Sequence, residues 1–289
     1  MTTSLLQTRW QELAVQHRDE ISGWTQPFRI RRRKGISHPI DDFLFVYYRY
    51  STRKLERWHP GVGVSLKGGA LAKGLFVANY YRYDGHDAVC DSSKIPDKSC
   101  ERMRWIADLL RRTQLNRPNF SCLGLHEWAM VYRGQEVRHE KTTRLRLAQA
   151  EIDQLVESRP LTCSHFDAFR FFANDAKPLN RVLPTLDSRA EFEQPACIHA
   201  NMDLYKWAFK SMPWIGSELL RNCFYLALEA RAIDMRASPY DLSEYSDYPP
   251  IKIETAAGRI EYEQLQREIA EKAKPLRQKL IDRLEEVLA

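Results

Sequence analysis

The chain has 289 residues, of which 44% are hydrophobic and 28% are charged, so it can bury a core and keep a polar surface. No apolar run approaches the roughly 18–20 residues of a membrane span, and the charged, amphipathic N-terminus is unlike a signal peptide. The six cysteines stand singly, without a CxxC pair, which favours reduced thiols over a disulfide framework. We therefore expect a cytoplasmic protein with no membrane partner.

The charge is distributed unevenly along the chain. The net charge is +6, but residues 1–150 hold 26 Lys and Arg against 15 Asp and Glu, whereas residues 151–289 hold 18 against 23. Arginine supplies 30 of the 44 basic residues, and its planar fork both matches phosphate oxygens and stacks on bases. The asymmetry favours a nucleic-acid partner, although any protein of this net charge has a basic face.

The first third of the chain alternates helix patterns with breaks. Apolar residues recur at helical spacing over 4–24. The basic stretch FRIRRRKG (28–35) then predicts either a phosphate-contacting strand or loop or an exposed basic loop. A short helix is expected to carry DFLFVYYRY (42–50). Glycines make 61–74 a poor helix, and Asp84-Gly85 is a hairpin signal between two strand patterns.

Helix patterns dominate the remainder of the chain. Residues 173–197 are richer in Pro, Asn and Asp and predict an extended connection, and the apolar run at 216–233 predicts a central buried helix. The expected helices are 97–114, 121–132, 147–158, 201–211, 216–233 and 256–288. Together the patterns predict an α+β fold, a helix-rich single globular domain over 1–289 with a small antiparallel sheet. Its first half, about 1–150, is basic, and its second half, about 151–289, holds the apolar helix.

Six short clusters place a histidine or a carboxylate among aromatic residues. They are HPIDDFLFVYY (38–48), LERWHPGVG (55–63), GLHEWAMVYR (124–133), CSHFDAFRFF (163–172), CIHANMDLYKWAF (197–209) and DMRASPYDL (234–242). Burying a polar group costs roughly 2–7 kcal/mol unless it is paired, so a plain core has little use for this pattern. The clusters predict a pocket of flat rings and ionisable groups, which suits a planar ligand such as a nucleobase.

Signatures of metal and nucleotide chemistry are incomplete or absent. HEWAM begins like HExxH but has Met130 in place of the second histidine. The Cys-x-His pairs at 163–165 and 197–199 offer four possible zinc ligands, yet structural zinc sites more often use CxxC-type spacing. The zinc-deaminase signature, the Walker A loop and the Rossmann glycine fingerprint do not occur. We therefore expect no cofactor, no metal and no nucleotide.

Taken in order, the six clusters resemble a family of bacterial proteins described as 3-methyladenine DNA glycosylases. The similarity covers nearly the whole chain, from HPIDDFLFVYY through GLHEWAMVYR and SHFDAFRFF to DMRASPYDL. Relatives of this kind also act in phage defence on hypermodified viral bases. The resemblance implies a monofunctional DNA glycosylase, which hydrolyses the N-glycosidic bond of a modified base in DNA and leaves an abasic site.

Glycoside hydrolysis passes through an oxocarbenium-like transition state, so a carboxylate is needed to stabilise the sugar and to orient or deprotonate water. Glu127 and Asp167 are the leading candidates, because each lies beside a histidine and among aromatic residues. His126 and His165 are expected to donate or orient protons. Asp42 is the reserve carboxylate.

A base in a duplex has to be flipped out and stacked on aromatic rings before it can be cleaved. The candidate substrate-binding residues are His38, Tyr47, Tyr48, Trp58, His59, Trp128, Asp203 and Tyr240. Phosphates are expected to be held by basic residues of the first half. The candidates for DNA binding are Arg31, Arg32, Arg33, Lys34, Arg53 and Arg57.

The identity of the excised base decides how much acid catalysis the site must supply. A 3-methyladenine is already cationic and leaves easily, whereas a glucosylated hydroxymethylcytosine of phage DNA leaves poorly. The many histidines and acids in the clusters favour the harder leaving group. Two other classes stay open: a non-catalytic nucleic-acid-binding module, and a nuclease, which would need clustered carboxylates for Mg²⁺.

Overall fold

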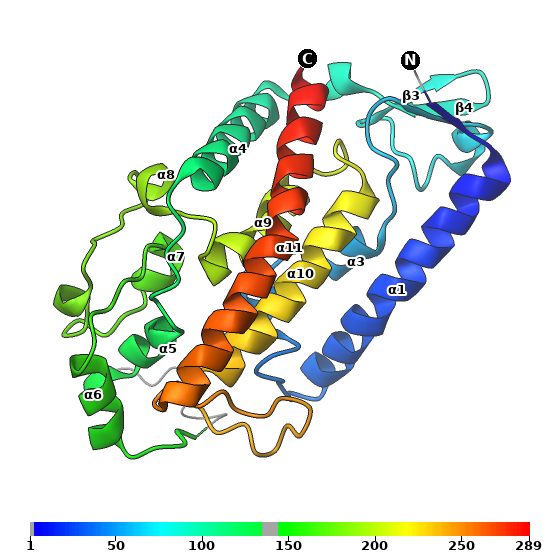
Figure 1. Ribbon diagram of the computed structural model, residues 1–289. Coiled ribbons are helices and arrows are strands. Elements are labelled where there is room, and N and C mark those ends of the chain that lie inside the picture. The colour runs from blue at the N-terminus through cyan, green and yellow to red at the C-terminus, as the bar shows by residue number, and fades with distance from the viewer. Residues whose placement is uncertain (1–2, 135–143) are drawn as a thin grey trace. The chain divides into compact units, whose positions relative to one another are not determined.

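The computed structural model describes residues 3–134 and 144–289, and Figure 1 labels its elements. The fold is helix-rich α+β, as predicted. The chain forms two compact units. Unit 1 comprises Met1–Leu110, Leu204–Tyr225 and Leu276–Ala289, and unit 2 comprises Arg111–Asp203 and Leu226–Pro275. Each unit is thus assembled from segments that are distant in sequence, so the boundary between the units does not follow the change in charge near residue 150.

Unit 1 begins with the long helix α1 (Gln7–Arg33). The segment FRIRRR lies in its last turns, so the prediction of a strand or loop there was wrong. Three arginines in the last turn, Arg31, Arg32 and Arg33, favour the negative end of the helix dipole and account for the extension. The helix ends just before Gly35, whose φ of +68° suits glycine.

The small sheet belongs to unit 1 and has the order β1-β2-β4-β3. Its strands are β1 (Thr3–Leu5), β2 (Val64–Leu66), β3 (Tyr81–Asp84) and β4 (Asp87–Cys90). The last three pair antiparallel, whereas β1 pairs parallel with β2. The predicted hairpin at Asp84-Gly85 is confirmed, and Gly85 has a φ of +58° in its turn.

The other helices follow the sequence patterns closely. They are α2 (Phe43–Tyr47), α3 (Thr52–Glu56), α4 (Asp97–Leu115), α5 (Leu125–Met130), α6 (Gln149–Glu157), α7 (Phe166–Phe169), α8 (Arg189–Phe192), α9 (Ile198–Lys210), α10 (Ser217–Arg236) and α11 (Ala256–Leu288). Short 3₁₀ turns lie at Gly69–Ala72, Ser92–Lys94, Tyr132–Gly134 and Lys177–Leu179. The predicted connection at 173–197 holds only one such turn and α8.

Helix α10 is the buried central element that its apolar sequence predicts. Leu220, Cys223 and Phe224 are buried in unit 1, and Leu226, Ala227 and Ala230 are buried in unit 2. Its C-terminal part also carries two buried charged residues, Arg231 and Asp234. Within the described residues, no helix combines the length and the apolar character required to cross a membrane.

Candidate functional site

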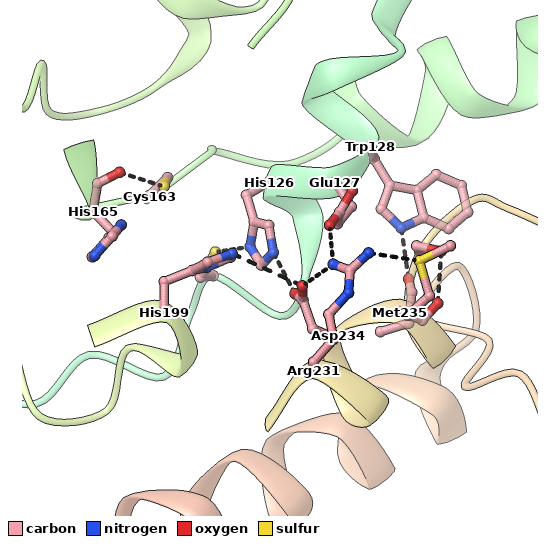
Figure 2. A network of polar contacts seen from close by, with 12 residues as sticks. His126, Glu127, Trp128, Cys163, His165, His199, Arg231, Asp234 and Met235 are labelled. Carbon is pink, nitrogen blue, oxygen red and sulfur yellow. Dashed lines mark hydrogen bonds and ion pairs between the residues drawn. The ribbon is translucent and has the colours of Figure 1, made fainter. Parts of the chain in front are cut away.

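Unit 2 buries a group of ionisable side chains that come from three parts of the chain. His126 and Glu127 lie on α5, Cys122 lies just before it, and Arg231 and Asp234 lie on α10. We call these five residues the relay cluster (Figure 2). His126, Glu127, Arg231 and Asp234 are each no more than 6% exposed, so their charges have to be balanced by one another.

The relay cluster is a continuous chain of polar contacts. His126 Nδ1 lies 3.3 Å from Cys122 Sγ, and His126 Nε2 lies 2.6 Å from Asp234 Oδ1. Arg231 donates from one nitrogen to Glu127 Oε1 at 3.0 Å and to Asp234 Oδ2 at 2.9 Å. Figure 2 shows the guanidinium of Arg231 between the two carboxyl groups. One guanidinium nitrogen thus ties two buried acids together.

The local sequence explains how α5 reaches α10 in unit 2. Gly124 precedes α5 with a φ of +75°, a conformation that side chains disfavour. A Cβ at this position would lie 3.2 Å from the Cβ of Ala237 and 3.3 Å from the ring of Tyr262. On α10, Arg231 and Asp234 stand three residues apart and therefore share a helix face.

The pKa values of the two acids of the relay cluster are shifted in opposite directions. Burial, and after it the negative charge of Asp234, raise the pKa of Glu127, against the effect of Arg231 and His126. Burial acts in the same direction on Asp234, but His126, His199 and Arg231 outweigh it and hold the pKa of Asp234 below its ordinary value. Burial and Asp234 thus favour the protonated form of Glu127, whereas the surrounding cations favour the ionised form of Asp234.

The histidine and the cysteine of the relay cluster lie in contact and shift each other's pKa. Burial acts to lower the pKa of His126, but Asp234 and Cys122 raise it well above its ordinary value. A hydrogen bond from Cys163 lowers the pKa of the Cys122 thiol well below its usual range, against burial and with help from His126. The neighbouring His199 is different, because burial lowers its pKa to about 3 and leaves it neutral.

A second buried group in unit 2 consists of His165, Glu193 and Asp203, which we call the carboxylate–histidine cluster. His165 Nε2 lies 3.4 Å from Glu193 Oε1 and 3.5 Å from Asp203 Oδ2. Arg189 joins this cluster to Asp167, with Nε 3.0 Å from Glu193 Oε1 and an Nη atom 2.6 Å from Asp167 Oδ2.

A small cavity of about 10 Å³ adjoins the relay cluster. Its lining includes Cys122, His126, Cys163, Cys197 and His199. A volume of this size is close to the least that holds one water molecule. A nucleobase therefore enters only if lining side chains move.

Unit 1 contains a much larger hollow, which we call the arginine groove. Its volume is about 1290 Å³, and it is lined by Phe28, Arg29, Arg32, Arg33, Gly35, Ile36, Ser37, Asp42, Phe45, Val46, Arg49, Tyr50, Ser51, Thr52 and Arg53. Arg32, Arg33 and Arg53, which are DNA-binding candidates, are exposed. Arg31 instead binds Asp42 through two of its nitrogens, at 3.0 and 2.5 Å.

A further pocket of unit 1, of about 400 Å³, contains two residues predicted to bind substrate, Trp58 and His59. His59 Nδ1 lies 2.8 Å from the hydroxyl of Tyr81, and burial lowers the pKa of His59 to about 3. Lys279 and Arg283 also line this pocket. A neutral histidine, an indole and two cations thus share a space large enough for a small ligand.

The other predicted binding residues make contacts within their own units. In unit 1, His38 Nδ1 accepts from the backbone N–H of Asp41, Tyr47 stacks on Phe43, and Tyr48 stacks on Tyr50. In unit 2, Trp128 is fully buried and donates its indole N–H to the carbonyl of Ala237, and Tyr240 is also buried. The remaining DNA-binding candidates, Lys34 and Arg57, are exposed.

The structure therefore divides the predicted site residues between the units. Glu127, His126, Asp167, His165 and Asp203 all belong to unit 2, whereas the reserve acid Asp42 belongs to unit 1. The predicted site residues did not include Cys122, Arg189, Glu193, Arg231 or Asp234. Only Arg231 and Asp234 had a usable signal, because the two opposite charges stand three residues apart on a largely apolar helix.

Comparison of the chain with protein-family models, with curated proteins and with solved structures finds no match.

Proposed function

We propose that the protein is a monofunctional DNA glycosylase whose reacting groups are those of the relay cluster. The observation that supports this most is the pair of buried acids, Glu127 and Asp234, held by one nitrogen of Arg231 with their pKa values moved in opposite directions. Two carboxyl groups of opposite protonation state are what glycosidic-bond hydrolysis uses.

The chemistry follows from the two protonation states. Protonated Glu127 donates its proton to the departing base, which leaves with the electrons of the N-glycosidic bond. Ionised Asp234 stabilises the positive charge that develops on the sugar. The carboxylate of Glu127 then takes a proton from the water that attacks the anomeric carbon. His126 fixes Asp234 through its 2.6 Å contact and orients it.

DNA binding is assigned to the arginine groove of unit 1. Exposed Arg32, Arg33 and Arg53 offer phosphate contacts on a surface that also carries the aromatic ring of Tyr50. Because the cavity at the relay cluster is only about 10 Å³, base entry has to be coupled to side-chain movement in unit 2. Before they move, these side chains exclude water from Glu127 and Asp234.

The substrate that fits this site best is a base that leaves poorly, because such a base needs a proton donor. A cationic purine leaves readily without one. We propose a glucosylated hydroxymethylcytosine of phage DNA, excised in the cytoplasm as antiviral defence. An alkylated purine such as 3-methyladenine, excised in repair, is the other substrate class. The resemblance of the six sequence clusters to the glycosylase family supports both.

The test is abasic-site formation in EDTA on three DNAs: unmodified, alkylated, and phage DNA with glucosylated hydroxymethylcytosine. The proposal expects release from the phage DNA, and release from alkylated DNA alone would assign the protein to repair. Metal-dependent strand cleavage without abasic sites would indicate a nuclease. No abasic sites on any of the three DNAs would contradict the proposal.

The arginine groove favours one second candidate, a non-catalytic nucleic-acid-binding module. This candidate needs the groove but not the acids of the relay cluster. It expects salt-dependent DNA binding by the wild-type protein and no base release, with binding unchanged in Glu127→Gln. Base release by the wild-type protein that is lost in Glu127→Gln would exclude it.

A further inference from the structure

We propose that His165, Glu193 and Asp203 of unit 2 bind one divalent transition-metal ion. The inference is separate from the proposed function, because none of these three residues belongs to the relay cluster. It also departs from the expectation of no metal in the sequence analysis. There the Cys-x-His pairs were considered as zinc ligands, whereas the structure brings together one of their histidines and two carboxylates.

The spacing of the donor atoms fits a single ion. One ring nitrogen of His165 and one oxygen from each acid lie within 4.8 Å of one another, and the nitrogen lies 3.4 and 3.5 Å from the two oxygens. Ligands at 2.0–2.1 Å from a tetrahedral metal are about 3.3 Å apart. The observed separations are therefore those of neighbouring ligands.

The histidine–acid group around Asp234 differs in this respect. His126, His199 and Asp234 also place donor atoms within 4.8 Å of one another, but His126 Nε2 lies only 2.6 Å from Asp234 Oδ1. That distance is the length of a charge-assisted hydrogen bond and is too short for two ligands of one ion. The same criterion thus selects the carboxylate–histidine cluster and rejects the group of His126, His199 and Asp234.

Hydrogen bonding does not account for the position of His165. The residue is only 1% exposed, and within the described parts of the chain neither of its ring nitrogens makes a hydrogen bond. A buried polar atom without a partner is costly. A metal ion would be coordinated by Nε2 of His165, the nitrogen that lies near both carboxylates.

The donor set indicates the kind of metal. One imidazole and two carboxylates suit Zn²⁺ or Mn²⁺, whereas a copper(I) or iron–sulfur site would need thiolates. Arg189, whose Nε lies 3.0 Å from Glu193 Oε1, would orient that ligand from outside the coordination shell. The ion would join three segments of unit 2: the residue before α7, the residue after α8, and α9 itself.

The first experiment measures metal in the wild-type protein. Elemental analysis of the purified full chain, and of chain stripped with a chelator and reloaded with ZnCl₂ or MnCl₂, should give about one ion per chain. Reloading should also raise the melting temperature, since an ion that binds only the folded state stabilises it. A stoichiometry near zero in both preparations, with no change in melting temperature, would overturn the proposal.

Variants then locate the site. Asp203→Asn and His165→Gln should each lower the bound metal at least tenfold, while His17→Gln, a buried histidine of unit 1, should keep it. Unchanged metal content in both cluster variants would place the ion elsewhere and contradict the assignment. If a variant fails to fold, the melting-temperature shift of the reloaded wild-type chain still decides.

Discussion

The arginine groove of unit 1 and the relay cluster of unit 2 place charges in opposite environments. In the groove, Arg32, Arg33 and Arg53 are exposed. In the relay cluster, Arg231 and Asp234 are at most 2% exposed and contact each other at 2.9 Å. Exposed charges cost little and attract a charged partner, whereas buried charges are expensive and persist only where each has its counter-charge.

The proposed function gives the groove and the relay cluster different tasks. A charge that stabilises a bound phosphate has to remain accessible, as the arginines of the groove are. A charge that stabilises a transition state acts most strongly where water is excluded, as it is around Asp234.

The largest effect on stability is expected from Asp234→Asn. The change leaves the buried Arg231 and His126 without their shared counter-ion, which costs about 3–5 kcal/mol of unfolding free energy. Urea denaturation measures this. Glu229→Gln is the matched control on the same helix, because its partner Lys272 and Glu229 itself are about half exposed, and a loss below about 1 kcal/mol is expected. Equal losses in the two variants would show that the relay cluster is not energetically coupled.

A moderate effect is expected on the pH dependence of stability. Because the pKa of Glu127 is raised, the folded state keeps the proton of Glu127 to a higher pH than the unfolded chain does. The contribution of Glu127 to the free energy of unfolding is therefore present at low pH and is lost as pH rises through the pKa of the folded state. The lowered pKa of Asp234 has the opposite effect. Its contribution to the free energy of unfolding is present above the ordinary aspartate pKa of about 3.9 and is lost as pH falls through the pKa of the folded state. His126, with its raised pKa, adds a second alkaline loss that begins above about 6.5.

Urea denaturation over a range of pH separates these contributions. Glu127→Gln should flatten the part of the alkaline loss that begins above about 4.3, the ordinary glutamate value, and should leave the later part due to His126. If the wild-type and Glu127→Gln curves have the same shape, the acid pair is not in opposite protonation states.

The smallest effect on stability is expected in unit 1. Replacing Arg32, Arg33 and Arg53 by alanine should change the unfolding free energy by no more than about 0.5 kcal/mol per site. It should reduce the slope of log affinity for DNA against log salt by about one per arginine. The control removes three other exposed arginines that do not line the groove, Arg9, Arg18 and Arg82. Equal slopes in the two triple variants would indicate that the groove has no special role in binding.

Much of the fold could be predicted from the sequence, because the long helices carry a clear apolar period. Helices α4, α10 and α11 begin and end within a few residues of the predicted spans, and the Asp84-Gly85 turn marks its hairpin. The stretch FRIRRR was mistaken for a strand or loop because its arginines dilute the apolar pattern. Their placement in the last turn of α1 is a helix-end effect, which periodicity does not report.

The candidate site was predictable in its parts but not in its connections. Glu127 and His126 stood out because they interrupt an apolar stretch, and the structure places both in the relay cluster. Their partners Arg231 and Asp234 lie more than 100 residues away, and no local pattern links them. Glu193 and Arg189 come from a segment without periodicity, so their place beside His165 depends on tertiary packing alone.

The most direct test of the account compares free-base release by wild-type protein, Glu127→Gln and Glu229→Gln on DNA with glucosylated hydroxymethylcytosine. The account predicts release by wild type and Glu229→Gln, and a loss of about 10²–10⁴-fold in Glu127→Gln with DNA affinity unchanged, as expected when a proton donor is removed. Full activity of a folded Glu127→Gln variant would contradict the assignment of the relay cluster as the reacting site.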